Sequence, residues 1–216
     1  MKKFIQTCVL ALGMAVLSAG VVQAEGEAGA AGYVTLVAPQ PTSDASKIEV
    51  VEMFWYGCSH CYHLEPLLSK WVSGIPSDVV FVRMPAILGP SWEILARGYY
   101  TAELLGVLDK IHAPLFNAIH EGKQKINNED DLAKFFVAQG IDEKQFRDTI
   151  KSFGVAAKLN RSKQMTQRYG ITGVPSLIVN GKYRTSAGDA GGQEQMLVVV
   201  DKLIAEERAA KTTAAK

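Results

Sequence analysis

Cysteine is scarce in this 216-residue chain, which has three, and neither sign of charge is in excess. With 23 basic and 22 acidic side chains, the sequence gives no electrostatic reason to expect nucleic acid or an anionic membrane surface as a partner. No internal repeat is apparent. Because cysteines are so few, the position of each one is informative.

The N-terminus has the three parts of a secretory signal peptide. Two lysines precede an uncharged apolar run of 15 residues from Cys8 to Val22, and small residues stand at Val22 and Ala24. Spanning a bilayer takes roughly 20 residues, so this run is short for a membrane anchor. We therefore expect cleavage near Ala24, which would remove residues 1–24 together with Cys8. The mature protein is not expected to span the membrane.

Cleavage would leave 192 residues (216 minus 24), a length that suits one domain with an insertion. The two remaining cysteines, Cys58 and Cys61, would then enter an oxidising compartment, where exported thiols normally end up paired.

The two cysteines follow a predicted strand and open a predicted helix. Residues 48–55 form a β-rich, largely apolar run that is typical of a buried central strand. From Cys61 to Trp71, apolar side chains recur on one face of a helix. Residues 79–82 predict a second buried strand. This succession is a βαβ unit, which is right-handed by default.

The remainder of the chain predicts a helical block and then a ββα segment. We expect helices at residues 128–140, 142–154, 155–169 and 193–207, an edge strand at 33–37, and a hairpin at 175–184 on an Asn180–Gly181 turn. In the helix at 142–154, Phe146, Ile150 and Phe153 would face inward. The tail after residue 207 is expected to fray.

The spacing of Cys58 and Cys61 predicts two unlike sulfurs. At a helix N-terminus the sulfur of Cys58 would meet unpaired N–H groups and the positive end of the helix dipole, both of which favour the thiolate. A protonated His60 would add positive charge nearby. Cys61, one turn into the helix, would be more buried. A stabilised thiolate makes the disulfide a better oxidant, by roughly 30 mV for each pKa unit.

The sequence allows two other interpretations of the pair. A static bridge usually closes a longer loop, because a loop of two residues constrains the unfolded chain little. A zinc site could use Cys58, Cys61 and His63, but no second Cys-x-x-Cys or His-x-x-x-His supplies a clear fourth ligand. A redox pair is therefore favoured, and no metal is expected.

Two segments resemble the DsbA family of periplasmic thiol:disulfide oxidases. They are EMFWYGCSHCY at residues 52–62 and GVPS at residues 173–176. The resemblance implies an α/β thioredoxin fold, βαβ…ββα, made by residues 25–87 and 155–216, with a helical domain inserted at residues 88–154. It also implies that the redox-active disulfide is the only reactive group, without a cofactor.

The resemblance assigns roles to individual residues. Cys58 takes the place of the nucleophile and Cys61 that of the resolving cysteine. Pro175 takes the place of a cis-proline that faces the cysteines, and the backbone of Val174 would pair with substrate. His60 matches the family histidine. Ser59 departs from the family, since the best-known members carry proline there, and this dipeptide tunes the reduction potential.

A charged pair is expected below the cysteines. Glu52 is a charge within the largely apolar first strand, and Arg83 lies on the neighbouring strand. The resemblance places an acidic–basic pair here, and we expect Glu52 to assist proton transfer to or from Cys61. Glu65, one turn after Cys61, is a second candidate for moving protons.

Aromatic residues surround the motif. Phe54 and Trp55 are expected in the core, while Tyr62 and Trp92 are better candidates for an apolar substrate surface. Three histidines, His63, His112 and His120, have no visible partners and are expected to be structural.

The sequence thus predicts a monomeric periplasmic oxidase that donates the Cys58–Cys61 disulfide to unfolded exported proteins. A membrane quinone-linked partner that re-oxidises it is implied by the resemblance alone. The alternatives are a disulfide isomerase or reductase, and a metal-binding or chaperone-like module. Residues 25–46 are too few for the dimerisation domain of periplasmic isomerases.

Overall fold

The computed structural model describes residues 31–214. The predicted signal peptide and Cys8 lie outside the described residues. None of the helices within residues 31–214 has the length and apolar character needed to cross a bilayer.

A mixed five-stranded sheet forms the centre of the fold, in the order β1-β5-β4-β2-β3. The strands are β1 (Val34–Thr35), β2 (Ile48–Phe54), β3 (Val79–Pro85), β4 (Ser176–Val179) and β5 (Tyr183–Ser186). β2 and β3 are parallel and are joined by helix α1 (Ser59–Ser73), while the other neighbouring pairs are antiparallel. This topology confirms the predicted βαβ and ββα units.

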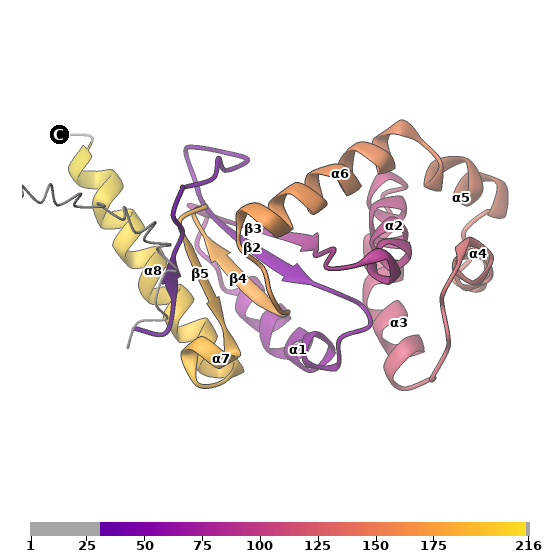
Figure 1. The fold of residues 1–216 in the computed structure, drawn as a ribbon, viewed down its shortest axis with the longest axis horizontal. Helices are drawn as coiled ribbons and strands as arrows, with labels where there is room; N and C mark the ends of the chain where they lie inside the picture. The colour runs from indigo at the N-terminus through magenta and orange to yellow at the C-terminus, as the bar shows by residue number, and fades with distance from the viewer. Residues whose placement is uncertain (1–30, 215–216) are drawn as a thin grey trace, which may run out of the picture.

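Helices cover both faces of the sheet (Figure 1). On one face, α1 and the C-terminal helix α8 (Gln193–Ala214) pack on Ile48 and Val50 of β2. On the other face, α6 (Phe153–Arg168) packs on Val51 and Met53. Because side chains alternate along a strand, Glu52 of β2 is directed toward the face that α1 covers.

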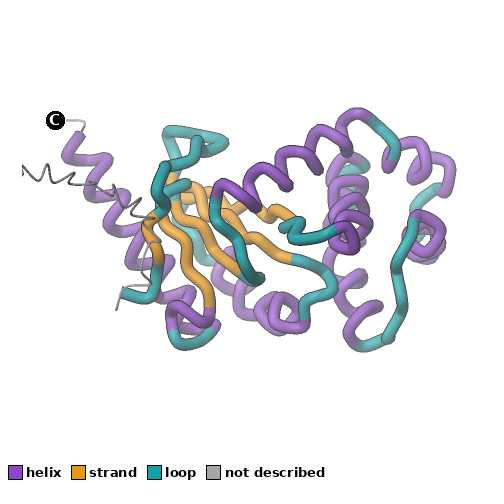
Figure 2. Tube along the Cα trace, viewed as in Figure 1, coloured by secondary structure: helices purple, strands orange, loops and turns teal. Residues whose placement is uncertain are grey.

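A block of helices stands at the end of the molecule opposite α8 (Figures 1 and 2). It consists of α2 (Pro90–Leu104), α3 (Leu108–His120), α4 (Glu129–Ala138), α5 (Glu143–Ile150) and the start of α6. Phe54 and Tyr56, at the end of β2, share one apolar cluster with Phe116 and Phe136 of the block. The segment that precedes the cysteines is therefore anchored in the core of the helical block.

Several predicted helix ends are confirmed by their caps. The side chain of Asn128 accepts the N–H of Asp131 at the start of α4, and Asp142 does the same for Gln145 at the start of α5. The Asn180–Gly181 turn is also confirmed. A side chain at Gly181 would be strained, since φ is +64° and a Cβ would lie 2.1 Å from the carbonyl oxygen of Gln40.

Three predictions about helix ends were wrong. α5 ends at Ile150 rather than Gly154, because Ser152 accepts the N–H of Val155 and starts α6. Phe153 opens α6 and is 87% exposed instead of facing inward. The predicted end of the last helix at residue 207 is also wrong, since α8 runs to Ala214 and Lys211 donates to two backbone carbonyls before β2.

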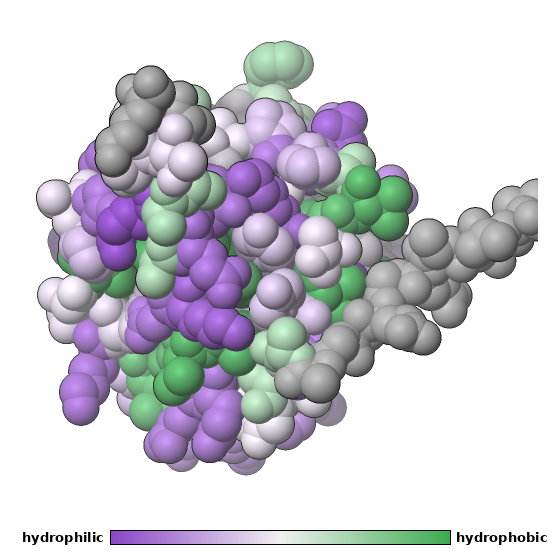
Figure 3. Space-filling view, turned by 90° about the vertical axis from the view of Figure 1, so that its left-hand side faces the viewer, coloured by the Kyte–Doolittle hydropathy of each residue, from purple (hydrophilic) through white to green (hydrophobic). Residues whose placement is uncertain are grey.

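At the end of the molecule that carries α8, polar and apolar residues are interspersed on the surface (Figure 3).

Candidate active site

Cys58 is the N-cap residue of α1 and is half-buried. A tight turn after β2 positions it, with its backbone N–H donating to the carbonyl of Trp55 at 2.9 Å. Cys61 lies one turn into α1 and is fully buried. Both side chains are free thiols. The sheet and the helix therefore present one accessible sulfur and one enclosed sulfur.

The surroundings of Cys58 favour its thiolate. Its pKa is lowered to about 6, first by a hydrogen bond from the Cys61 thiol and then by the backbone N–H groups of Cys61 and His60, while partial burial opposes the shift. The positive charge of His60 adds to the lowering. In the protonated form, the Cys58 thiol instead donates to the carbonyl oxygen of Val174, with sulfur and oxygen 3.4 Å apart.

The surroundings of Cys61 disfavour its thiolate. Burial raises the pKa of Cys61, and its hydrogen bond to Cys58 and the nearby charges of Cys58 and Glu52 raise it further. The two sulfurs of one motif thus differ in charge near neutral pH. This difference follows from the helix geometry, because the N-terminal residue meets open N–H groups and the residue one turn later meets the core.

The second motif lies against the first. The peptide bond between Val174 and Pro175 is cis, and Val174 packs beside Cys58 in the cluster shared with the helical block. A cavity of about 520 Å³ opens next to this loop, lined by His60, residues 172–176 and residues around Ser186 and Asp189. The structure therefore brings His60, Cys58 and the Val174–Pro175 loop to one surface.

Glu52 and Arg83 face each other across β2 and β3. A carboxylate oxygen of Glu52 lies 3.2 Å from Nε of Arg83, but neither carboxylate oxygen has a hydrogen-bond partner among residues 31–214. Burial raises the pKa of Glu52, as does the charge of Glu65, and Arg83 only partly offsets them. The predicted pair is present, and its acid is held in a setting that favours the protonated form.

Arg83 also contacts Glu65 of α1, with nitrogen and oxygen 3.0 Å apart. Burial opposes the charge of Glu65, but hydrogen bonds from His112 and Arg83 outweigh it, so its pKa is lowered. A cavity of about 370 Å³ reaches Glu65, Arg83 and His112. Two carboxylates with opposite pKa shifts therefore flank one guanidinium, one in the core and one beside a cavity.

The structure gives His112 and His120 partners that the sequence did not show. His112 contacts the hydroxyl of Tyr56 at 2.8 Å and a carboxylate oxygen of Glu65 at 3.1 Å. His120 contacts the backbone carbonyl of Tyr56 at 2.8 Å. Phe116 packs on the Tyr56 ring between them. His112, Phe116 and His120 follow one another at intervals of four residues, which indicates that they share one face of α3. Nothing in the neighbouring sequence pointed to Tyr56 as their partner.

The aromatic residues around the cysteine motif differ in how far they are buried. Phe54 is in the core as predicted, whereas Trp55 is half-buried and stacks on Trp92 with ring centroids 4.3 Å apart. Tyr62 is partly exposed and stacks on His120, and its hydroxyl donates to Glu121.

His63 is exposed and lines a cavity with Tyr62. Within the described residues, no group of three or more Cys, His, Asp or Glu side chains is arranged to hold a metal ion.

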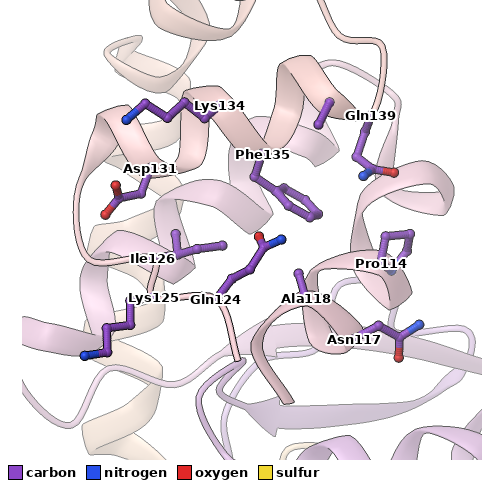
Figure 4. Close-up of a pocket in the computed structure, with 11 residues that line it drawn as sticks. Pro114, Asn117, Ala118, Gln124, Lys125, Ile126, Asp131, Lys134, Phe135 and Gln139 are labelled. Atoms are coloured by element: carbon purple, nitrogen blue, oxygen red, sulfur yellow. The ribbon is translucent and has the colours of Figure 1, made fainter. Parts of the chain in front are cut away.

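A cavity of about 700 Å³ lies in the helical block (Figure 4). It lies between α3, α4 and the segment that joins them, with Phe135 and Ile126 on its apolar wall and Lys125, Lys134 and Asp131 near its rim. None of the residues that line it was predicted as a site residue.

Comparisons with known proteins agree with this geometry. Residues 76–198 match the family described as "DSBA-like thioredoxin domain". The chain is 44% identical over 182 residues to the thiol:disulfide interchange protein DsbA of Pseudomonas syringae pv. tomato, covering 84% of this chain and 85% of that protein. It is 41% identical over 210 residues to the protein of the same name from Pseudomonas aeruginosa, covering 97% and 99%. The latter alignment is long enough to include both cysteines.

Solved structures are similar as well. The crystal structure of Pseudomonas aeruginosa DsbA aligns with a TM-score of 0.80 at 42% identity, covering 84% of this chain and 94% of that one. The crystal structure of oxidoreductase DsbA from Xylella fastidiosa aligns with a TM-score of 0.77 at 34% identity, covering 82% and 96%.

Proposed function

Because the chain belongs to the family of DsbA-like thioredoxin domains, we propose that it is a periplasmic thiol:disulfide oxidase that passes the Cys58–Cys61 disulfide to exported proteins. The observation that carries this proposal is the unequal environment of the two sulfurs. Cys58 is accessible and stable as a thiolate, whereas Cys61 is buried and stable as a thiol. A pair of this kind favours the reduced state of the enzyme and therefore gives its disulfide away readily.

The reaction has two thiol–disulfide exchanges. In the first, a substrate thiolate attacks the sulfur of Cys58, the bond to Cys61 breaks, and Cys61 takes up a proton as it leaves. In the second, another substrate thiolate attacks the substrate sulfur of the mixed disulfide, and Cys58 leaves as a thiolate. Two substrate thiols are oxidised to one disulfide. One of their two protons ends on Cys61 and the other in solvent.

Glu52 is the proposed donor of the proton to Cys61. Its raised pKa keeps a proton available, and it lies on the face of the sheet that is covered by α1, the helix that carries Cys61. When the enzyme is re-oxidised, the proton must move back from Cys61 to Glu52. Glu65, joined to Glu52 through Arg83 and adjacent to the 370 Å³ cavity, is the proposed exchange point with solvent.

The proposed substrate position is the surface shared by Cys58 and the Val174–Pro175 loop. A substrate segment in extended conformation would pair with the backbone of Val174, and the cavity of about 520 Å³ next to the loop gives room for its side chains. We assign the helical insertion to residues 88–154 and the thioredoxin-like part to residues 25–87 and 155–216. The re-oxidising partner is proposed to be a quinone-linked membrane protein.

The first test is the equilibrium of the Cys58–Cys61 pair against a glutathione redox buffer, read by the mass shift of alkylated thiols. A potential well above that of glutathione supports an oxidase. A thioredoxin-like potential near about −270 mV would instead support a reductase. The second test is oxidation of a reduced, unfolded protein with two cysteines. Neither Cys58→Ser nor Cys61→Ser can form the Cys58–Cys61 disulfide, so both variants should fail to oxidise this substrate. When Cys61→Ser is mixed with oxidised glutathione, its Cys58 thiolate should displace one glutathione thiolate and stop at the mixed disulfide, because Cys61 is no longer there to resolve it.

A further inference from the structure

The first residue of helix α8 contacts the first turn of the active-site helix α1. Gln193 is the first residue of α8, and its side-chain amide donates to the backbone carbonyl oxygen of His60 at 2.7 Å. The two residues are 133 positions apart in the sequence. Gly191 ends the short helix α7 (Ala187–Ala190) in the left-handed conformation, with φ of +85°, and so turns the chain into α8.

The carbonyl that Gln193 contacts belongs to the peptide unit next to the reactive sulfur. The C=O of His60 and the N–H of Cys61 are the two ends of one conjugated amide group. That N–H is one of the backbone groups that stabilise the Cys58 thiolate. A helix carbonyl normally accepts one hydrogen bond, from the N–H four residues on, and its second lone pair remains available. Gln193 supplies a donor to that second position.

Hydrogen bonds arranged in a chain strengthen one another. A donor at the oxygen of His60 draws electron density toward that oxygen, which leaves the N–H of Cys61 more positive. A more positive N–H stabilises negative charge on the sulfur of Cys58. The donor also restrains the peptide plane in the first turn of α1, so the N–H keeps its direction toward the sulfur.

We propose that Gln193 is a positioning residue for the redox pair, holding and polarising the His60–Cys61 peptide so that α8 helps to set the thiolate character of Cys58. This inference rests on the proposed function of the Cys58–Cys61 pair. Its immediate consequence concerns the pKa of Cys58, an equilibrium property that is measured without a substrate. A purely structural Gln193 would attach α8 to α1 and leave that property unchanged.

The test is a titration of Cys58 in the reduced full-length mature protein. Gln193→Met keeps the length of the side chain but removes the donor. It should raise the pKa of Cys58 by about 0.3, which is the size expected when one bond in a hydrogen-bond chain is lost. At a pH below the pKa, alkylation by iodoacetamide should then slow about twofold. Gln193→Glu replaces the donor with a negative acceptor and should raise the pKa further.

Two variants complete the design. Gln193→Lys restores a donor on a flexible chain and should bring the pKa back to the wild-type value or below it. Gln195→Met, an exposed change on the same helix, is the matched control and should leave the pKa unchanged. Thermal unfolding of each oxidised variant shows whether the fold is retained.

The inference is overturned if Gln193→Met and Gln193→Glu titrate like the wild type, even if they unfold at a lower temperature. It is also overturned if Gln195→Met shifts the pKa as much as Gln193→Met. A protein that failed to exchange disulfides with any substrate would refute the proposed function, but the ordering of these pKa values would still decide the role of Gln193.

Discussion

The carbonyl oxygen of Val174 lies 3.4 Å from the sulfur of Cys58, although the two residues are 116 positions apart in the sequence. Only the protonated thiol can make this contact, because a thiolate or a disulfide sulfur has no hydrogen to donate. The carbonyl is therefore released in the two forms of Cys58 that take part in exchange. Under the proposed function, it is then available to accept a backbone N–H from a substrate strand.

The first prediction concerns the titration of Cys58. In the reduced protein, thiolate absorbance in the ultraviolet should rise with a midpoint near pH 6, whereas an ordinary cysteine has a pKa of about 9. The signal should vanish in Cys58→Ser. A midpoint at the ordinary value in the wild type would contradict the assignment of Cys58 as the stabilised thiolate.

The same shift makes stability depend on pH. The pKa of Cys58 is lower in the folded reduced protein than in the unfolded chain, so its contribution is fully present above the unfolded value and is lost as the pH falls through about 6. The oxidised protein has no thiol to titrate. The stability of the reduced form relative to the oxidised form should therefore increase as the pH rises from about 6 toward the unfolded value, which thermal unfolding of both forms would measure.

Glu52→Gln tests the proton transfer to Cys61. Without the carboxyl group, breaking the Cys58–Cys61 bond should slow by about tenfold or more, since a positioned acid or base typically contributes at least that factor. The pH profile of mixed-disulfide formation, sampled by rapid acid quench, should lose the inflection that Glu52 gives it. An unchanged profile would remove Glu52 from the mechanism.

Glu52→Gln should also change stability in a pH-dependent way. Burial raises the pKa of Glu52, so the folded protein holds this proton more tightly than the unfolded chain. The resulting stability is present below the unfolded pKa and is lost as the pH rises through the folded value. Glutamine stays neutral throughout. Urea unfolding should show the variant gaining about 1–3 kcal/mol relative to the wild type between acidic and mildly alkaline pH.

Glu49→Gln is the matched control for both Glu52 experiments. Glu49 lies on the same strand and is also buried, but it accepts hydrogen bonds from the backbone and the hydroxyl of Ser43. Its replacement should cost about 1–2 kcal/mol of stability and leave the exchange profile unchanged. Equal behaviour of the two variants would show that burial alone, and not the position beside Cys61, explains the effect of Glu52.

Ser59→Pro tests the departure from the family pattern. Ser59 is the first residue of α1, where proline is favoured, and the backbone of Cys58 (φ −91°, ψ 117°) already has the conformation that a following proline requires. The variant should be more stable by about 0.4–1 kcal/mol. The N–H groups of His60 and Cys61 remain, so the pKa of Cys58 should stay near 6.

Ser69→Pro, in the interior of the same helix, is the control for this substitution and should cost about 3 kcal/mol. A large fall in the pKa of Cys58 in Ser59→Pro, read by the same titration, would show that residue 59 acts on the sulfur through more than its backbone.

Helix and turn boundaries were predictable where a cap is written into the sequence. Asn128 and Asp142 accept the N–H groups expected of them, and the Asn180–Gly181 turn forms the hairpin. Gly154 predicts a helix end, but Ser152 supplies a competing helix start, which explains the error at Phe153 and Gly154. Side-chain capping decided the boundary, since it satisfies an N–H that would otherwise lack a partner.

The sequence by itself determined the buried strand and the cysteine pair at the following helix, because strand patterns, caps and the Cys-x-x-Cys spacing are properties of neighbouring residues. The second motif at Val174–Pro175 was indicated by the resemblance to the DsbA family. Only the tertiary structure decided which groups surround the cysteines. It placed His112 and His120 on Tyr56, left Glu52 without a hydrogen bond within the described chain, and brought Gln193 to the carbonyl of His60. These contacts join residues from 56 to 133 positions apart. Their formation depends on how the helices pack against the sheet, which no local pattern specifies.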